Sequence, residues 1–90
     1  MLIKNILYHP AFVKEFKKLD AAIQQRAMET ERLFRSNPLH PSLRLHQLKG
    51  RLKGSWSVSV NLKIRIIFKR MSNGDIVFYS IGVHDIYRSL

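Results

Sequence analysis

The end of the sequence places an imidazole and a phenol, His84 and Tyr87, after a long basic segment. This segment, residues 32–74, contains no acidic residue. Its cations are Arg32, Arg35, Arg44, Lys49, Arg51, Lys53, Lys63, Arg65, Lys69 and Arg70. Basic side chains that neutralise nucleic-acid phosphates release condensed counterions, so such a surface binds nucleic acid without regard to sequence. The segment therefore predicts phosphate binding, and the imidazole adds a group that can exchange protons near neutral pH.

The composition is that of one small folded domain, residues 1–90. A chain of 90 residues, 46% of them apolar, can bury a small core and is not a disordered basic tail. Its formal net charge of +10 implies a polyanionic partner, either nucleic acid or an acidic protein, because uncompensated charge repels itself in the compact state.

Cysteine is absent, and the four His residues show no metal-ligand spacing. We therefore expect a mechanism without a metal or another cofactor. The apolar start of the chain is interrupted by Lys4 and Asn5, and no apolar run approaches the roughly 18 residues of a membrane span. These features predict a cytoplasmic protein with no membrane partner.

The first 38 residues predict a strand and two helices. Residues 3–8 favour a strand, and Pro10 can open a helix because its missing N–H needs no partner in the first turn. Asp20 is suited to cap a second helix, which Pro38 should end. Apolar side chains recur at helical spacing in both helices, at Phe12, Phe16 and Leu19 and at Ile23, Ala27, Thr30 and Phe34. The two helices should form a hairpin.

The second half changes to the period of a strand. Trp56 alternates in phase with Val58 and Val60, which favours a core role for the indole, while the intervening serines predict a wet face. Arg65 points away from the aliphatic stripe of residues 64–70. A turn signal at residues 72–75 precedes a last β-rich run, 76–81. The fold class is therefore α+β, with an N-terminal strand, a two-helix hairpin and a three- to four-stranded antiparallel sheet whose second face is open to a ligand.

Three segments of the sequence resemble the RelE/ParE toxin superfamily. They are residues 46–61 (HQLKGRLKGSWSVSVN), 65–68 (RIIF) and 81–84 (IGVH), and the resemblance covers nearly the whole chain. It implies a RelE-like microbial ribonuclease fold and the toxin of a type II toxin–antitoxin pair. Most toxins of this kind are endoribonucleases that cut messenger RNA in the ribosomal A site, whereas the ParE branch inhibits DNA gyrase without catalysis.

The resemblance also assigns catalytic roles. Arg65 matches the strand arginine of RelE-like, YoeB-like and HigB-like toxins; His84 matches the C-terminal catalytic histidine of YafQ-like and YoeB-like toxins; and His46 matches another histidine of YafQ-like toxins. On residue type alone, Arg65 is a solvated cross-strand arginine, His84 a capping or packing residue, and His46 an exposed edge-strand histidine. The chain departs from the family where YafQ-like toxins have a second His and an Asp, near Ser59 and Lys63, and it has no counterpart of the YoeB-like glutamate base.

Cleavage of RNA requires a base for the 2′-hydroxyl proton, an acid for the departing 5′-oxygen and cations for the phosphorane. His84, which Asp85 could orient, is the first candidate acid or base, and Arg65 is suited to grip the phosphate. Tyr87 could stack on a base, donate to phosphate or simply close the core. The remaining cations expected to bind RNA are Lys49, Arg51, Lys53, Lys63 and Lys69. The sequence does not assign base and acid among His46, His84 and the loop lysines.

The expected partners are messenger RNA, the ribosome with its ribosomal RNA, and a cognate antitoxin that covers the basic face. Operator DNA is expected only indirectly, through the toxin–antitoxin complex. Two other classes of protein fit the charge as well: a ParE-like non-catalytic inhibitor of gyrase, and a simple nucleic-acid-binding module.

Overall fold

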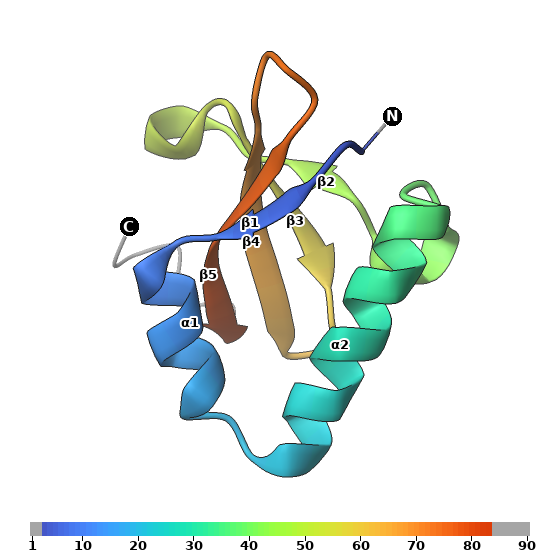
Figure 1. Cartoon of the computed structure of the whole chain (residues 1–90), viewed down its shortest axis with the longest axis vertical. Coiled ribbons are helices and arrows are strands. Elements are labelled where there is room, and N and C mark those ends of the chain that lie inside the picture. Colours follow the sequence, from blue (N-terminus) through green and yellow to red (C-terminus); the bar gives the residue numbers. More distant parts are fainter. Residues whose placement is uncertain (1–2, 84–90) are drawn as a thin grey trace.

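The computed structural model describes residues 3–83 and has two helices packed on one face of a five-stranded sheet (Figure 1). The elements in chain order are β1 (Ile6–Tyr8), α1 (Pro10–Lys17), α2 (Ala21–Ser36), β2 (His46–Gln47), β3 (Ser55–Ser59), β4 (Ile64–Arg70) and β5 (Ile76–Val83), with the short 3-10 turns η1 (Pro41–Leu43) and η2 (Gly50–Leu52). This arrangement confirms the expected α+β class.

The sheet has the strand order β1-β5-β4-β3-β2. Strands β2 to β5 are paired antiparallel, as the sequence predicts, whereas β1 pairs parallel with β5, Ile6 lying opposite Ile76. The sheet is therefore mixed. Its first strand begins at Ile6 and not at Ile3, although the Lys4 amide still donates to the Gly74 carbonyl over 3.0 Å.

Both helices begin where the sequence predicts, and α2 ends before Pro38 as expected, whereas α1 ends at Lys17, before Leu19 of its predicted apolar stripe. Pro10 is the first residue of α1, and the preceding His9 accepts a hydrogen bond at Nδ1 from the Ala11 amide over 3.0 Å. Asp20 caps α2 by accepting from the Ile23 amide over 2.9 Å, and Asn37 follows its last turn. A side-chain acceptor at this position satisfies one of the amides that the first helical turn leaves unpaired.

The core lies between the helices and the sheet. Phe34 of α2, Phe68 of β4 and Phe78 of β5 are 0–1% exposed, with the rings of Phe34 and Phe68 4.9 Å apart. The alternation predicted for β3 is confirmed on this side, because Val58 is buried and Trp56 packs half-buried against the same cluster.

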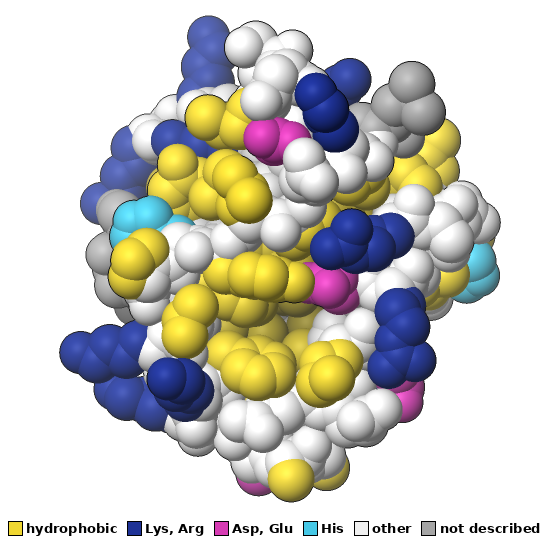
Figure 2. All heavy atoms as spheres, in the orientation of Figure 1, with side chains coloured by type: hydrophobic (Ala, Val, Ile, Leu, Met, Phe, Trp, Pro, Cys, Tyr) yellow, Lys and Arg dark blue, Asp and Glu magenta, His cyan; other side chains and the backbone are white. Residues whose placement is uncertain are grey.

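A groove remains between the two helices, because they diverge from the short loop that joins them (Figure 1). The groove has a volume of about 440 Å³, and Phe12, Val13 and Met28 are among the residues that line it. Figure 2 shows the apolar side chains gathered on this side of the molecule. The helices thus form the expected hairpin, and its two arms are the walls of an apolar groove.

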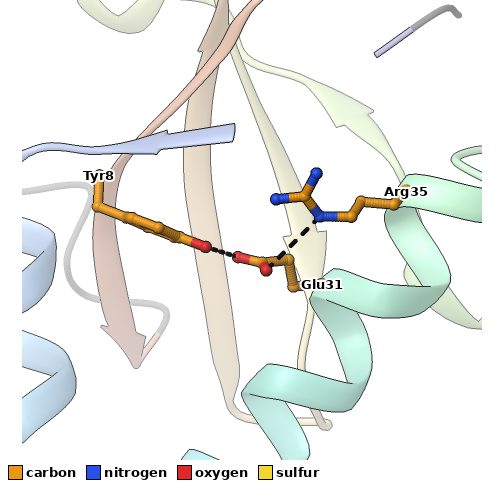
Figure 3. A network of polar contacts seen from close by, with 3 residues as sticks. All are labelled: Tyr8, Glu31 and Arg35. Atoms are coloured by element: carbon orange, nitrogen blue, oxygen red, sulfur yellow. Dashed lines mark hydrogen bonds and ion pairs between the residues drawn. The ribbon is translucent and has the colours of Figure 1, made fainter. Parts of the chain in front are cut away.

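A polar network ties β1 to α2 at the edge of this groove (Figure 3). The Tyr8 hydroxyl donates to Glu31, whose other carboxylate oxygen lies 3.7 Å from Nε of Arg35. Partial burial and the neighbouring Glu31 carboxylate raise the pKa of Tyr8 above its usual value. The network therefore favours the neutral phenol.

Candidate nucleic-acid interface

The sheet face opposite the helices carries Arg65 and the serines of β3. Ser55, Ser57 and Ser59 are 3%, 0% and 8% exposed. The prediction that this face of β3 is exposed to solvent is therefore wrong. A serine side chain is short, and the longer side chains beside it reach across it. Arg65 does so here, since its Nε donates to Ser57 Oγ over 3.3 Å.

The Arg65 guanidinium is held from two sides. Besides the bond to Ser57, one terminal nitrogen donates to the main-chain carbonyl of Arg44 over 3.3 Å. Arg44 has φ +47°, a left-handed conformation that a residue other than glycine rarely adopts. The strained backbone after η1 thus supplies a carbonyl that helps to fix the orientation of the guanidinium.

His46 lies on the same face as Arg65. It is an exposed residue of the edge strand β2 and pairs directly with Ser57 of β3. Residues opposite one another in an antiparallel pair project to the same side of the sheet. Ser57 therefore has the His46 imidazole on the edge-strand side and the Arg65 guanidinium bonded to its hydroxyl, so the structure brings these two candidates together.

The loop between β2 and β3 brings cations to the same region. His46, Lys49 and Arg51 are among the residues that line an open depression of about 450 Å³. Gly50 and Gly54, with φ +68° and +93°, shape the η2 turn, a conformation that glycine adopts without steric cost. Lys53, also exposed, follows η2 directly.

The two remaining lysines lie at opposite ends of β4. Lys63 is exposed in the turn before this strand, where its amide donates to Asn61 Oδ1 over 2.8 Å. Lys69 is exposed near the other end of β4. It lies opposite Ser55, the first residue of β3, which follows the β2–β3 loop. The structure therefore places Lys69 with the loop cations and Lys63 apart from them.

The sequence did not identify Tyr79 and His9 as site residues. Their rings stack with centroids 5.2 Å apart, and Lys69 Nζ lies 5.2 Å from the centre of the Tyr79 ring. The break in the period of two appears only in the burial of β5, at residues 76, 78 and 81, because the sequence of residues 76–79 is continuously apolar or aromatic. Arg44 was missed as well, and the sequence gives no sign of its left-handed backbone.

Two predicted catalytic residues, His84 and Tyr87, lie outside the described residues. The described part of β5 pairs Gly82 with Arg65 and ends at Val83, which pairs with Ile64. The catalytic roles of His84 and Tyr87 remain predictions.

The charges of this face have one sign. The strands β2, β3 and β4 and the loop with η2 all fall within the acid-free residues 32–74. Within residues 3–83, no group of three or more His, Cys, Asp or Glu could hold a metal ion. In the same part of the chain, no helix has the length and apolar character needed to span a membrane.

Arg65, His46 and the loop cations can bind a phosphate and move a proton. A guanidinium fixed by other contacts is prepared for a bidentate bond to phosphate oxygens. A neighbouring imidazole can take or give a proton near neutral pH. The lysines add attraction for the flanking phosphates. Such a set suits the cleavage of a phosphodiester bond.

Comparison with solved structures shows what the fold is similar to. No protein-family model and no curated protein matches the sequence. The YoeB/ParE toxin from Agrobacterium tumefaciens matches with a TM-score of 0.74 and 15% identity over 90% of this chain and 99% of that one. YafQ from E. coli strain BL21(DE3) matches at 0.67 and 23% identity over 91% and 94% of the two chains, and the YoeB–YefM complex from Staphylococcus aureus at 0.70 and 19% over 93% and 99%.

Proposed function

Because the chain has the fold of the RelE/ParE toxin superfamily, we propose that it is the toxin of a type II toxin–antitoxin pair. We further propose that it is an endoribonuclease which cuts messenger RNA in the ribosomal A site and so inhibits translation in the cytoplasm. Toxins of the YoeB, YafQ and RelE type are known as ribonucleases, and the fold similarity supports the same class here.

One observation carries the proposal: Arg65 and His46 are both neighbours of Ser57, on a sheet face with no acidic residue in its strands β2 to β4. Nε of Arg65 contacts Ser57 Oγ, and His46 is the cross-strand partner of Ser57. A cation that binds the scissile phosphate and a group that transfers its protons must lie close together for RNA cleavage. A surface that only binds nucleic acid needs no such pairing.

The proposed reaction is attack of the 2′-hydroxyl on the adjacent phosphorus. The P–O2′ bond forms as the P–O5′ bond breaks, leaving a 2′,3′-cyclic phosphate and a 5′-hydroxyl. A base takes the 2′-hydroxyl proton and an acid protonates the departing 5′-oxygen. We assign phosphate binding to Arg65, proton transfer to His46 and His84, and flanking contacts to Tyr87 and the lysines.

The proposed protein partner is a cognate antitoxin. The YoeB–YefM complex is a toxin of this fold bound to its partner. With a net charge of +10, this chain favours a partner that is acidic where it covers the basic face. Binding there would compete with RNA and keep the toxin inactive.

The test is to map 5′ ends of cellular transcripts after brief induction of the wild-type chain, of Arg65→Ala and of Arg70→Ala. Arg70 lies on the same strand and is exposed, so its removal is a matched loss of charge outside the site. We expect new cuts in translated frames with the wild type and with Arg70→Ala, and none with Arg65→Ala.

Two results would contradict the proposal. Growth arrest with DNA damage signalling but without new transcript ends would favour a gyrase inhibitor like those of the ParE branch. Equal cleavage by Arg65→Ala and the wild type would remove the assignment of Arg65. Thermal unfolding of the purified variants checks that each is folded.

A further inference from the structure

His9, Lys69 and Tyr79 form a second cluster, which we call the ring cluster. The imidazole and the phenol are stacked at 30° with a centroid distance of 5.2 Å. Lys69 Nζ lies 5.2 Å from the Tyr79 centroid, within the range of a cation–π contact. His9 and Lys69 are exposed and Tyr79 is half-buried, so the ring cluster can be reached from solvent.

A β-bulge in β5 leaves Tyr79 outside the regular strand pairing. On β4, Ile67 and Phe68 are consecutive, but their partners on β5 are Ser80 and Phe78. Tyr79 is therefore the one residue of this stretch without a partner in the ladder. Phe78 and Ile81 on either side are both buried in the core, and the extra residue is what brings Ile81 back to the core face.

The packing of β5 does not require Tyr79. With Tyr79 removed, Phe78, Ser80 and Ile81 would still alternate between the two faces of the sheet. Core packing therefore does not explain why β5 has an extra residue here, or why that residue is a tyrosine at the surface. Bulges often serve to aim a side chain at a functional site.

The ring cluster lies on the face of the candidate interface. Arg65 and Lys69 are four residues apart on β4 and project to the same side of the sheet. At about 3.3 Å per residue their Cα atoms are about 13 Å apart. Arg65 is also bonded toward Ser57 of β3, whereas Lys69 lies over the Tyr79 ring of β5 on the other side of β4. The two cations are therefore directed apart, and Lys69 is placed for a neighbouring nucleotide.

The orientation of the His9 ring is fixed by the start of α1. Nδ1 of His9 accepts the Ala11 amide hydrogen, so the neutral imidazole carries its proton on Nε2. The ring is held both by this bond and by the stack on Tyr79. A ring held in place loses little conformational entropy when a flat partner packs on it.

We propose that the ring cluster is a binding subsite for a nucleotide of single-stranded RNA other than the one that is cut. The exposed surface of the stacked rings takes the base, and the Lys69 ammonium takes a phosphate. The chemistry is that of single-strand binding, in which aromatic rings stack on bases and cations follow the backbone. The choice of RNA as the ligand rests on the proposed function.

An acidic protein is the less favoured ligand. A carboxylate needs only the ammonium, and two stacked rings would contribute nothing specific to its binding. A base offers a flat face that matches a ring. The stacked rings, more than the charge, therefore point to nucleic acid.

The test measures fluorescence anisotropy of a short RNA whose 2′-hydroxyls are methylated, so that it cannot be cut. A series with one abasic nucleotide at each position in turn locates a base that contributes to binding. Tyr79→Ala removes the platform, and Tyr79→Phe keeps it. His9→Asn removes a ring but keeps a good helix cap. Lys69→Gln is compared with Lys18→Gln. This control removes the same charge at the C-terminal end of α1, the end opposite His9.

We expect Tyr79→Ala to weaken binding of the intact RNA by about 5- to 150-fold, the range of base–aromatic stacking. Tyr79→Phe should stay within about twofold. One abasic position should weaken binding to the wild type by a similar factor and have no further effect on Tyr79→Ala. Lys69→Gln should weaken binding more than Lys18→Gln does.

Three results would overturn the inference. The first is a wild-type protein that does not bind the RNA at all, and the second is binding by Tyr79→Ala as tight as that of the wild type. The third is a loss of RNA affinity on Tyr79→Ala that is equally large whichever nucleotide of the RNA is abasic. A variant that binds RNA normally but binds polyglutamate less tightly would assign the cluster to a protein partner instead. Transcript mapping with Arg65→Ala tests the proposed function separately. Base-dependent binding without any cleavage would leave the subsite standing and remove only the ribonuclease.

Discussion

The Nε–H of Arg65 is bonded to the hydroxyl of Ser57, a side chain that is 0% exposed. A buried serine on the adjacent strand therefore helps to fix the orientation of the guanidinium. Without such contacts, an arginine at this position would sample several rotamers in water, and ordering it on RNA would cost free energy.

We expect Ser57→Ala to lower the rate of RNA cleavage several-fold, because the Arg44 carbonyl still holds the guanidinium. Arg65→Lys should lose more, since an ammonium keeps the charge but cannot form the bidentate bond. Single-turnover cleavage of RNA measures both. In the Arg65→Lys background Ser57→Ala should have little added effect, and fully additive losses would show that Ser57 does not act through Arg65.

The loop lysines should control the salt dependence of RNA binding. Each phosphate contact to single-stranded nucleic acid contributes about 0.7 to the slope of log affinity against log salt concentration. Lys49→Gln with Lys53→Gln should therefore lower this slope by about 1.4, as measured by anisotropy titrations over a range of salt. Lys14→Gln with Lys18→Gln removes the same charge from α1, and an equal change in slope there would contradict a specific role for the loop.

Glu15 of α1 should stabilise the fold through its hydrogen bonds to β5. Its carboxylate accepts from Ser80 Oγ over 2.8 Å and from the Ile81 amide over 3.2 Å. Glu15→Ala would leave the buried Ser80 hydroxyl and the Ile81 amide unpaired, so we expect the free energy of unfolding to fall by about 2–3 kcal/mol. Urea denaturation at constant m-value measures this, and Glu29→Ala, an exposed control on α2, should change it by less than about 0.5 kcal/mol.

The pKa of Tyr8 predicts how stability changes at alkaline pH. Desolvation and Glu31 raise this pKa above 10.0 in the folded state, so the folded protein holds the phenolic proton more tightly than the unfolded chain does. The contribution to stability is complete below about pH 10, the unfolded pKa, and is lost as the pH rises through the folded pKa. Tyr8→Phe should remove this part of the alkaline decline in unfolding free energy, and an unchanged decline would assign it to other groups.

Much of the fold follows from local patterns in the sequence. Pro10 and Asp20 define where the helices begin, and the alternation of residues 56–60 and 64–68 identifies the sides of β3 and β4 that face the core. The parallel pairing of β1 with β5 was not predicted, because it joins residues 70 positions apart and no local pattern encodes it.

The site was only partly predictable for the same reason. Residue types and the family resemblance indicated Arg65 and His46, which the structure places on one face. The carbonyl of Arg44 and the ring of His9 come from distant segments, and they reach the site only through tertiary packing. The burial of the β3 serines also depends on neighbours across the sheet, so a polar alternation alone could not reveal it.

The pairing of β1 with β5 also affects how the protein is made. Ile6 is synthesised early, yet its partner Ile76 is translated 70 residues later. Until then the nascent chain lacks β5, the strand that lies between β1 and β4, and the Glu15 carboxylate lacks the Ser80 and Ile81 groups that it binds. Contacts of such long sequence separation form slowly and late. A ribosome that translates this chain should therefore carry an incompletely folded domain until β5 emerges.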